Sequence, residues 1–369
     1  MERVACPHCD LVHAPFSLRP GEEARCSRCA TALPRSPLPG DAHKGAAIVA
    51  TAIVAFAIAV STPLMRLSGL GREAEASLPA SAAYMWFEGS HVAAILVALF
   101  TIVLPGAYLA LALAARLGET RSPAPRWADR AARWSLLVTP WAMPEVMLLA
   151  ALVAYVKISQ VAPAAPGIGL YATAALAAML ALARDGSQGR VPGASVRATS
   201  SAESSLARSK ALLVAAAVCY VPANLLPVLI TNTTDGAEAD TILDGVQALH
   251  QSGSWFLALI VLVASFVIPL AKIGALACLC VMVEKGIPAP RRESARLFRV
   301  LEVAGRWSML DVFVDAFVVA LVQLPPFLWV RPGAGVPFFA ATAVLTMLAY
   351  MAFDKRLLWS VREHGLRHG

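Results

Sequence analysis

Charged residues are scarce in this sequence. Asp, Glu, Lys and Arg make up 15% of the 369 residues, whereas hydrophobic residues make up 58%. In a soluble domain of this size, about a quarter of the residues are usually charged. Buried helices of a large soluble protein would also need polar faces, which the long apolar stretches of this chain lack. The composition therefore excludes an ordinary soluble domain and indicates a membrane protein.

Catalytic signatures are absent as well. The sequence has no nucleophile elbow, no phosphate-binding loop and no HExxH motif, which are short motifs that indicate hydrolytic or nucleotide chemistry. We therefore expect that the protein is not an enzyme. Without an ATPase motif, any work that it performs would draw on a partner, on a gradient or on downhill flow.

Long apolar runs dominate the chain instead. Eight of them have close to the roughly 20 residues that a helix needs to cross a bilayer. They are residues 46–64, 90–115, 140–158, 167–183, 211–230, 255–283, 308–324 and 335–353. Prolines within several runs are tolerable, because neighbouring helices can satisfy the carbonyls that a proline leaves without a donor. The predicted fold class is an all-α polytopic membrane protein with eight transmembrane helices.

The basic residues predict how the chain is oriented. The first 45 residues are polar and contain no signal-like apolar run, so we expect them to stay in the cytosol. With that orientation and eight spans, 26 of the 31 Lys and Arg residues fall in cytosolic segments and three in outer loops. This bias follows the positive-inside rule and predicts a multi-pass protein of the bacterial inner membrane with both termini in the cytosol. The basic residues are spread over five segments, which argues against a nucleic-acid-binding patch.

Two CxxC pairs near the N-terminus predict a zinc site. They are Cys6-Pro7-His8-Cys9 and Cys26-Ser27-Arg28-Cys29, separated by the stretch 10–25. This is the spacing of a zinc ribbon, because each turn directs two thiolates at one ion and two turns close a tetrahedral site. We predict one structural Zn²⁺, whose binding supplies folding free energy that so short a segment lacks. Disulfides would be disfavoured in a reducing cytosol, and a thioredoxin-type CxxC would need a βαβ setting. His8 and His13 are interpreted as bystanders.

The two halves of the chain resemble each other. Matching residues recur at nearly constant offsets. Pro63 matches Pro227, Gly89 matches Gly253 and Pro105 matches Pro269, all 164 apart; Arg133-Trp134-Ser135 matches Arg306-Trp307-Ser308, 173 apart; Glu145 matches Asp311, Lys157 matches Gln323 and Gly167 matches Gly333, all 166 apart. The change of offset indicates a seven-residue insertion after Ser135 in the first half. With an even number of spans each, both repeats would enter the membrane in the same direction.

Four regions follow from this pattern. Residues 1–40 are the predicted zinc ribbon, 41–183 the first four-helix repeat, 184–210 a flexible cytosolic linker rich in Ser, Gly, Ala and Arg, and 211–369 the second four-helix repeat with a basic tail. In each repeat a polar outer loop is expected after the first span. Within the second of these loops, residues 241–251 are amphipathic and are predicted to lie flat on the outer surface.

Ionisable residues within predicted spans are the candidate functional groups. Each costs roughly 2.5–3.5 kcal/mol on insertion scales, so each needs a reason. They are Glu145, Lys157, Lys272, Asp311 and Asp315. Asp311 and Asp315 share a helix face and lie at a similar depth to Lys272, so a pair between Lys272 and one of these acids is expected. The pair is either structural or a titratable relay that biases two conformations. Lys157, near the end of its span, fits snorkelling.

Prolines and one tryptophan complete the candidate set. Pro222, Asn224 and Pro227 lie at the end of one span, and Pro269 lies inside the next. The prolines either kink helices around a cavity or only shape the packing, and Asn224 is placed to cap a broken helix. Trp307 follows an arginine at the cytosolic end of a span, as interfacial anchors do.

Several stretches resemble the paraquat-inducible protein A family of bacterial inner-membrane proteins. They are the N-terminal CxxC pairs, the stretches 220–227 (YVPANLLP), 265–272 (SFVIPLAK), 305–314 (GRWSMLDVFV) and 319–324 (VALVQL), and the first-half stretch 144–158. The resemblance covers almost the whole chain. It implies an inner-membrane component that loads or unloads phospholipid for a periplasmic MCE-domain partner. Family members often carry a second cysteine motif before the second repeat, whereas residues 184–210 contain no cysteine, so a second metal site is not expected.

Two other functions stay open on the sequence. One is a proton-coupled exporter of small amphiphiles, since intramembrane acids suit both kinds of transport. The other is a membrane scaffold that anchors and regulates the partner without transporting anything.

Overall fold

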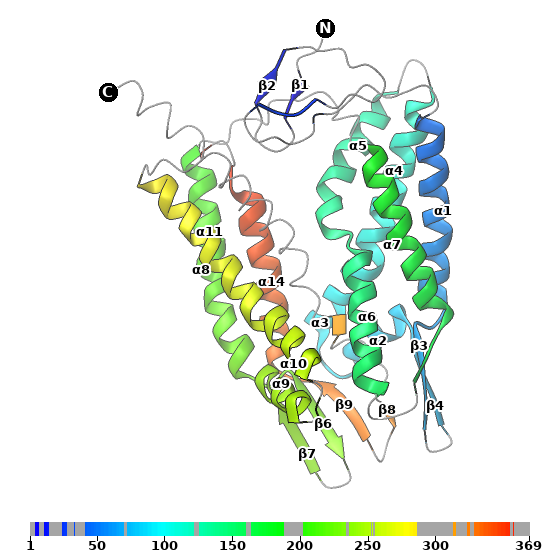
Figure 1. Cartoon of the computed structure of the whole chain (residues 1–369), viewed down its shortest axis with the longest axis vertical. Helices are drawn as coiled ribbons and strands as arrows, with labels where there is room; N and C mark the ends of the chain where they lie inside the picture. The colour runs from blue at the N-terminus through cyan, green and yellow to red at the C-terminus, as the bar shows by residue number, and fades with distance from the viewer. Residues whose placement is uncertain are drawn as a thin grey trace.

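The computed structural model describes residues 4–6, 11–14, 24–27, 33, 41–69, 72–121, 125–159, 164–187, 202–233, 236–251, 253, 255–285, 313–314, 323–324, 328–354 and 357. Long helices run roughly parallel to one another, and strands β3 to β9 lie at one end, here called the strand end (Figure 1). Two short strands near the N-terminus, β1 (Val4–Ala5) and β2 (Val12–His13), lie at the opposite end.

Helices account for most of the described chain. In the first half they are α1 (Asp41–Ser61), α2 (Leu78–Phe87), α3 (His91–Ala98), the π-helical segment η1 (Leu99–Val103), α4 (Leu104–Glu119), α5 (Arg126–Val138), the 3₁₀ turn η2 (Thr139–Trp141), α6 (Pro144–Ser159) and α7 (Ile168–Ser187). In the second half they are α8 (Ala202–Leu225), α9 (Ile242–Gln251), α10 (Trp255–Leu262), the π-helical segment η3 (Val263–Val267), α11 (Ile268–Glu284) and α14 (Gly335–Ala352).

Six helical segments of the described chain are long and apolar enough to cross a membrane. They are His43–Ser61, His91–Glu119, Arg126–Val156, Ser204–Leu225, Ala258–Glu284 and Gly335–Ala352. Each coincides with one of the eight predicted runs, so six of those predictions are confirmed as apolar helices. The run 167–183 lies on α7, whose apolar part, Ile168–Ala183, is shorter than these six. The run 308–324 lies outside the described residues except for 313–314 and 323–324.

The order of elements in the first half recurs in the second. Strands β3 (Met65–Gly69) and β4 (Arg72–Ala76) are followed by α2, α3, η1 and α4, and strands β6 (Leu229–Thr233) and β7 (Gly236–Asp240) are followed by α9, α10, η3 and α11. Each of these elements begins at the same distance along the chain from its counterpart as Pro227 from Pro63. The glycines that end α2 and α9 also correspond, since Gly89 and Gly253 both have a positive φ, 82° and 81°.

The prediction of an all-α chain is wrong at the strand end. The outer segments that were expected to be polar loops form β-hairpins, and two later strands, β5 (Ala164–Pro166) and β9 (Leu328–Pro332), pair with them. The strand orders are β4-β3-β5 and, with β8 (Gln323–Leu324), β7-β6-β9-β8, all antiparallel. The β4 edge of the first sheet lies beside the β8 edge of the second. Pairing in the hairpins satisfies the backbone N–H and C=O groups of the segments that follow the helices. These segments have no long apolar strand pattern, so the sequence did not indicate the strands.

The third membrane helix of the first half is interrupted. Helix α5 ends at Val138, the chain makes a 3₁₀ turn at Thr139–Trp141, and α6 begins at Pro144. The break coincides with the seven-residue insertion after Ser135. Pro140 and Pro144 explain it, because neither proline can donate the backbone hydrogen bond that a continuous helix needs.

Prolines also explain the two π-helical segments. Pro105 and Pro269 stand at the second residue of α4 and α11, directly after η1 and η3. A proline inside a helix lacks an N–H and clashes with the carbonyl four residues earlier, and one wider turn relieves that clash. Both prolines are buried.

Alanines let the long helices approach closely. Helix α1 packs on α7, and α8 packs on α14. Ala52 and Ala59 of α1 are fully buried, and so are their repeat counterparts in α8, Ala216 and Ala223. In lipid, where helix association depends on van der Waals contact, small residues at such positions bring the backbones together.

The buried core has one part common to both halves and two separate parts. Near the strand end, Leu64 and Met65 of the first half and Val228 and Phe339 of the second belong to one cluster. Toward the opposite end, the first half has its own cluster and the second half has another. Among the described residues, the strand end is therefore where the two halves join.

Candidate functional site

Among the described residues of the second half, Lys272 is the charged residue that is buried most clearly. It lies in the first turns of α11, just after η3 and Pro269, and 6% of its surface is exposed. The sequence marked it because a lysine inside a span is costly, and burial among helices adds to that cost. Its ammonium group therefore needs polar partners within the helix group formed by α8, α11 and α14.

Thr346 supplies one such partner. The Lys272 Nζ donates a hydrogen bond to Thr346 Oγ1 of α14 at 3.1 Å, and that hydroxyl donates to the carbonyl of Ala343 at 2.9 Å. Thr346 is buried, with 3% of its surface exposed. Sequence reasoning missed Thr346, although a threonine within the apolar run 335–353 was the available signal. Its contact with Lys272 joins α11 to α14, which lie far apart in the sequence.

Serines of α8 continue the polar contacts away from the strand end. Ser209 Oγ donates to the carbonyl of Ala349 at 2.9 Å, and Ser205 Oγ donates to the carbonyl of Ala352 at 2.6 Å. The backbone N–H of Asp354 donates to Ser205 Oγ at 2.9 Å, directly after α14. The Ala352 carbonyl, at the end of α14, thereby gains a donor from α8. The Ala349 carbonyl also accepts from the N–H of Phe353 at 3.2 Å, and both serine contacts hold α8 against α14.

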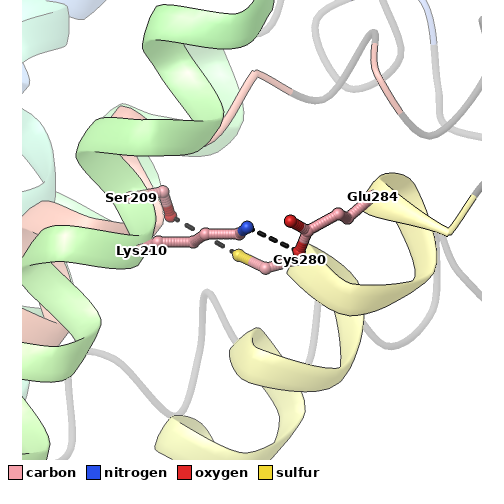
Figure 2. A network of polar contacts seen from close by, with 4 residues as sticks. All are labelled: Ser209, Lys210, Cys280 and Glu284. Atoms are coloured by element: carbon pink, nitrogen blue, oxygen red, sulfur yellow. Dashed lines mark hydrogen bonds and ion pairs between the residues drawn. The ribbon is translucent and has the colours of Figure 1, made fainter.

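An ion pair joins α8 and α11 at the end that lies away from the strands. Lys210 of α8 lies 2.5 Å from Glu284 of α11, and the Sγ of Cys280 lies 4.0 Å from Ser209 Oγ (Figure 2). Both charged side chains are partly exposed, 37% and 55%. A solvent-exposed pair of this kind contributes little stability by itself. It joins α8 to α11 beside the buried Cys280.

The asparagine and prolines that the sequence marked lie at the strand end of α8, where side-chain hydrogen bonds surround the last turn. Asn224 Nδ2 donates to the carbonyl of Tyr220 at 2.8 Å, which places Asn224 as a cap within the last turn of α8. Tyr220 Oη donates to the carbonyl of Phe266, within η3, at 3.1 Å. Pro222 lies inside α8, and Pro227 precedes β6. The tyrosine thus meets a carbonyl in the widened turn that precedes Pro269.

The other ionisable candidates are not brought to Lys272 by the described contacts. Glu145 is half-buried in the first turn of α6, and Lys157 lies near the end of the same helix, in the first half. Asp311, Asp315 and Trp307 lie outside the described residues, so the expected pair between Lys272 and an acid remains a prediction. Glu145, as an acid in the first turn of α6, interacts favourably with the positive end of its own helix.

The N-terminal cysteine region forms a small cluster of its own. Cys6 and Cys26, one from each CxxC pair, are buried together with Leu33, with 0% and 3% of their surfaces exposed. The Nε2 of His13 lies 3.3 Å from the Sγ of Cys26, so this histidine contacts the cluster. Cys9 and Cys29 lie outside the described residues. In the part of the chain that the structure describes, no three Cys, His, Asp or Glu side chains form a metal-binding group.

The two described cysteines nevertheless fit the predicted zinc site. Cys6 and Cys26 come from separate CxxC pairs and meet in one cluster, which a site built from both pairs requires. The backbone N–H of Cys6 donates to the carbonyl of Leu11 at 2.9 Å, and the N–H of Leu33 donates to that of Ala24 at 2.7 Å. These contacts hold Cys6 against Leu11 and Leu33 against Ala24.

The family model described as paraquat-inducible protein A matches residues 43–189 and 206–363. "Intermembrane transport protein PqiA" of Escherichia coli (strain K12) is 26% identical over 410 aligned positions, covering 97% of this chain and 95% of the relative. "Lipophilic envelope-spanning tunnel protein A" of the same organism is 26% identical and covers 98% and 92%. A "probable intermembrane transport protein" of Haemophilus influenzae is 26% identical and covers 97% and 96%. No solved structure matches the chain.

Proposed function

The chain belongs to the paraquat-inducible protein A family, and on this premise we propose that it is the inner-membrane component of an intermembrane lipid transport system. In that role it loads or unloads phospholipid for a periplasmic MCE-domain partner. The observation that carries the proposal is that relatives named for intermembrane transport align with 97% of this chain. The membrane helices are included in that alignment, so the likeness is not confined to a soluble module.

The proposed membrane arrangement is eight spans in two repeats of four, with both termini in the cytosol. The distribution of Lys and Arg supports the orientation. The matching order of strands and helices, at one constant offset, supports the repeat. In this arrangement the strand end lies outside the membrane on the periplasmic side, where a periplasmic partner is accessible.

We also propose that proton movement is coupled to transport through Lys272. A buried ammonium that hydrogen-bonds Thr346 supports this proposal, because gaining or losing a proton there changes the interaction between α11 and α14. Asp311 and Asp315 are the proposed exchange partners, and Glu145 is the corresponding acid of the first half. A purely structural pair is the alternative, and the two differ in what an uncharged replacement does.

A single structural Zn²⁺, held by Cys6, Cys9, Cys26 and Cys29, is proposed for the N-terminal module. The shared burial of Cys6 and Cys26 supports it. Closed four-cysteine sites stabilise short cytosolic folds and leave no open position for chemistry. The metal would therefore hold the module together and take no part in moving lipid.

Affinity purification in mild detergent, with mass spectrometry of the proteins and lipids retained, tests the transport proposal. A co-purified MCE-domain protein together with phospholipid is the expected result. A partner without lipid would support a scaffold and contradict lipid loading. Substrate efflux by vesicles that contain this chain alone would favour a proton-coupled exporter of small amphiphiles, for which the buried lysine is equally suitable.

A further inference from the structure

Helix α5 is seated on α4 by small residues. Ala128 and Ala131 are buried, with 4% and 8% of their surfaces exposed. A Cβ added at Gly118 of α4 would lie 2.2 Å from the Cβ of Ala128. This close approach fixes the face of α5 that turns toward α4, and so also the face that turns away from it.

The exposed side of α5 carries arginines and tryptophans, together with Asp129, Leu136 and Leu137. Trp127 and Trp134 are 42% and 60% exposed, and Arg126, Arg130 and Arg133 are exposed as well. Residues three and four apart lie on one side of a helix, so Trp127, Arg130 and Trp134 form a single stripe. The name α5 face is used below for five residues: Arg126, Trp127, Arg130, Arg133 and Trp134.

Much of the positive charge of this region is not neutralised by protein. Within the ranges that the structure describes, Arg121, Arg126 and Arg130 form no ion pair, whereas the neighbouring Arg116 lies 3.4 Å from Glu119. The guanidinium of Arg121 lies 5.9 Å from the ring centre of Trp127, which extends the α5 face toward α4. An exposed group of arginines without acidic partners fits an anionic ligand.

The position of α5 indicates the class of that ligand. Helix α5 lies away from the strand end, toward the end where β1 and β2 lie (Figure 1), and the apolar helix α6 follows it after the break at Thr139–Trp141. Tryptophan is enriched where a membrane helix meets the headgroups, and arginine binds phosphate through two parallel hydrogen bonds. We propose that the α5 face binds the phosphate headgroup of anionic phospholipids in the cytoplasmic leaflet. The proposal rests on the membrane orientation of the proposed function, and it identifies where the protein first meets lipid.

The second repeat differs in sequence at this place. In the register that matches Ser135 with Ser308, Arg126, Arg133 and Trp134 are matched by Arg299, Arg306 and Trp307, whereas Trp127 and Arg130 are matched by Val300 and Val303. A general membrane anchor would be expected in both repeats. The extra arginine and tryptophan therefore assign the headgroup site to the first half.

Binding of short-chain phosphatidylglycerol to the detergent-purified full-length protein, measured by native mass spectrometry, tests the proposal. The double variant Arg126→Gln/Arg130→Gln should bind about 30-fold more weakly, because each hydrogen bond lost between an arginine and the phosphate changes the affinity by roughly a fivefold factor. The single variant Arg130→Gln should bind about fivefold more weakly, and this milder change keeps the test valid if the double variant fails to fold. Arg66→Gln/Arg331→Gln is the matched control, since it removes the same charge at the strand end, where these arginines pair with Glu75 and Glu88.

Any of three results with lipid would overturn the headgroup site. They are unchanged binding by both α5 variants, an equal loss in the control, and equal affinity of the wild type for phosphatidylcholine. Equally tight binding of inorganic phosphate would also overturn it, because the site would then not be specific for lipid. Since the measurement contains no transport step, loss of the site leaves the transport proposal to its own test, and failure of transport leaves the site intact.

Discussion

Gly333 lies directly against Pro227. A Cβ added at Gly333 would lie 2.2 Å from the carbonyl oxygen of Pro227, and the first half repeats this relationship between Gly167 and Pro63, also at 2.2 Å. Gly167 directly follows β5 and Gly333 directly follows β9, the strands that pair with the hairpins. The prolines lie just after α1 and α8, the first long helix of each half. The two contacts therefore bring the start of the last helix of each half against the end of its first.

Replacing Gly333 by alanine should destabilise the protein. A methyl group cannot fit beside the Pro227 carbonyl without moving backbone, and such overpacking costs about 1–3 kcal/mol. We expect Gly333→Ala to unfold at a lower temperature in detergent. Gly274→Ala is the control, because nothing lies within 4 Å of a Cβ at that position of α11. Equal unfolding temperatures for Gly333→Ala and the wild type would contradict the close contact.

Neutralising Lys272 should abolish transport and separate a relay from a structural pair. If Asp311 is its partner, Lys272→Met alone strands a buried carboxylate, at a cost of about 3–5 kcal/mol if the group stays ionised. Lys272→Met/Asp311→Asn should restore folding because no uncompensated charge remains. A relay predicts that this double variant is expressed but fails to complement a barrier-defective strain. Full complementation at normal expression would end the relay hypothesis.

Thr346 should matter to the extent that it accepts the Lys272 hydrogen bond. Thr346→Val keeps the shape and removes the hydroxyl, so a buried donor loses a partner, which typically costs about 1–3 kcal/mol. We expect lower thermal stability and weaker complementation in this variant. Thr346→Ser, which retains a hydroxyl, should lie between it and the wild type. Thr342→Val is the control, since Thr342 donates to the carbonyl of Phe338 within its own helix.

The purified protein should contain about one zinc per chain. Cys6→Ser/Cys26→Ser should remove the metal, because each change eliminates one thiolate of the proposed site. Elemental analysis of protein purified without added metal measures both values. A zinc content near zero in the wild type would contradict the site, and a content near two would show a second site that residues 184–210 were not expected to form.

The start of α9 should depend on pH. The hydroxyl and the backbone N–H of Thr241 donate to the carboxylate of Asp244 at 2.7 and 2.9 Å, and these bonds hold the pKa of Asp244 below its ordinary value. Because the folded-state pKa is lowered, the contribution is present above the ordinary pKa of an aspartate and is lost as the pH falls through the folded-state value. Asp244→Asn should therefore reduce hydrogen-exchange protection of residues 242–246 at neutral pH.

The comparison of Asp244→Asn with the wild type should be made at each pH, so that intrinsic exchange rates cancel. The two proteins should converge below the pH at which Asp244 is protonated. A difference that persists unchanged in acid would mean that the carboxylate charge plays no part in capping α9.

Much of the fold follows from the sequence alone. Six of the predicted runs form apolar helices where they were expected, because hydrophobic length is a local property that a bilayer demands. The repeat offset was readable from matched prolines and glycines, and strands and helices recur at that same offset. Burial of Lys272 was also expected, since a lysine within a span has few other solutions.

What only the tertiary structure decided depends on residues far apart in the chain. The pairing of β6 with β9 joins Leu229 to Pro332 and Thr233 to Leu328, and no local pattern in a short polar loop specifies so distant a partner. The contact of Thr346 with Lys272 likewise depends on how α14 packs beside α11. The insertion after Ser135 was visible in the sequence, but not that the helix breaks there, between α5 and α6. The local sequence thus determines the length of the helices and the order of the repeats. The hydrogen-bond partners of buried polar groups are determined only by how the helices pack against one another.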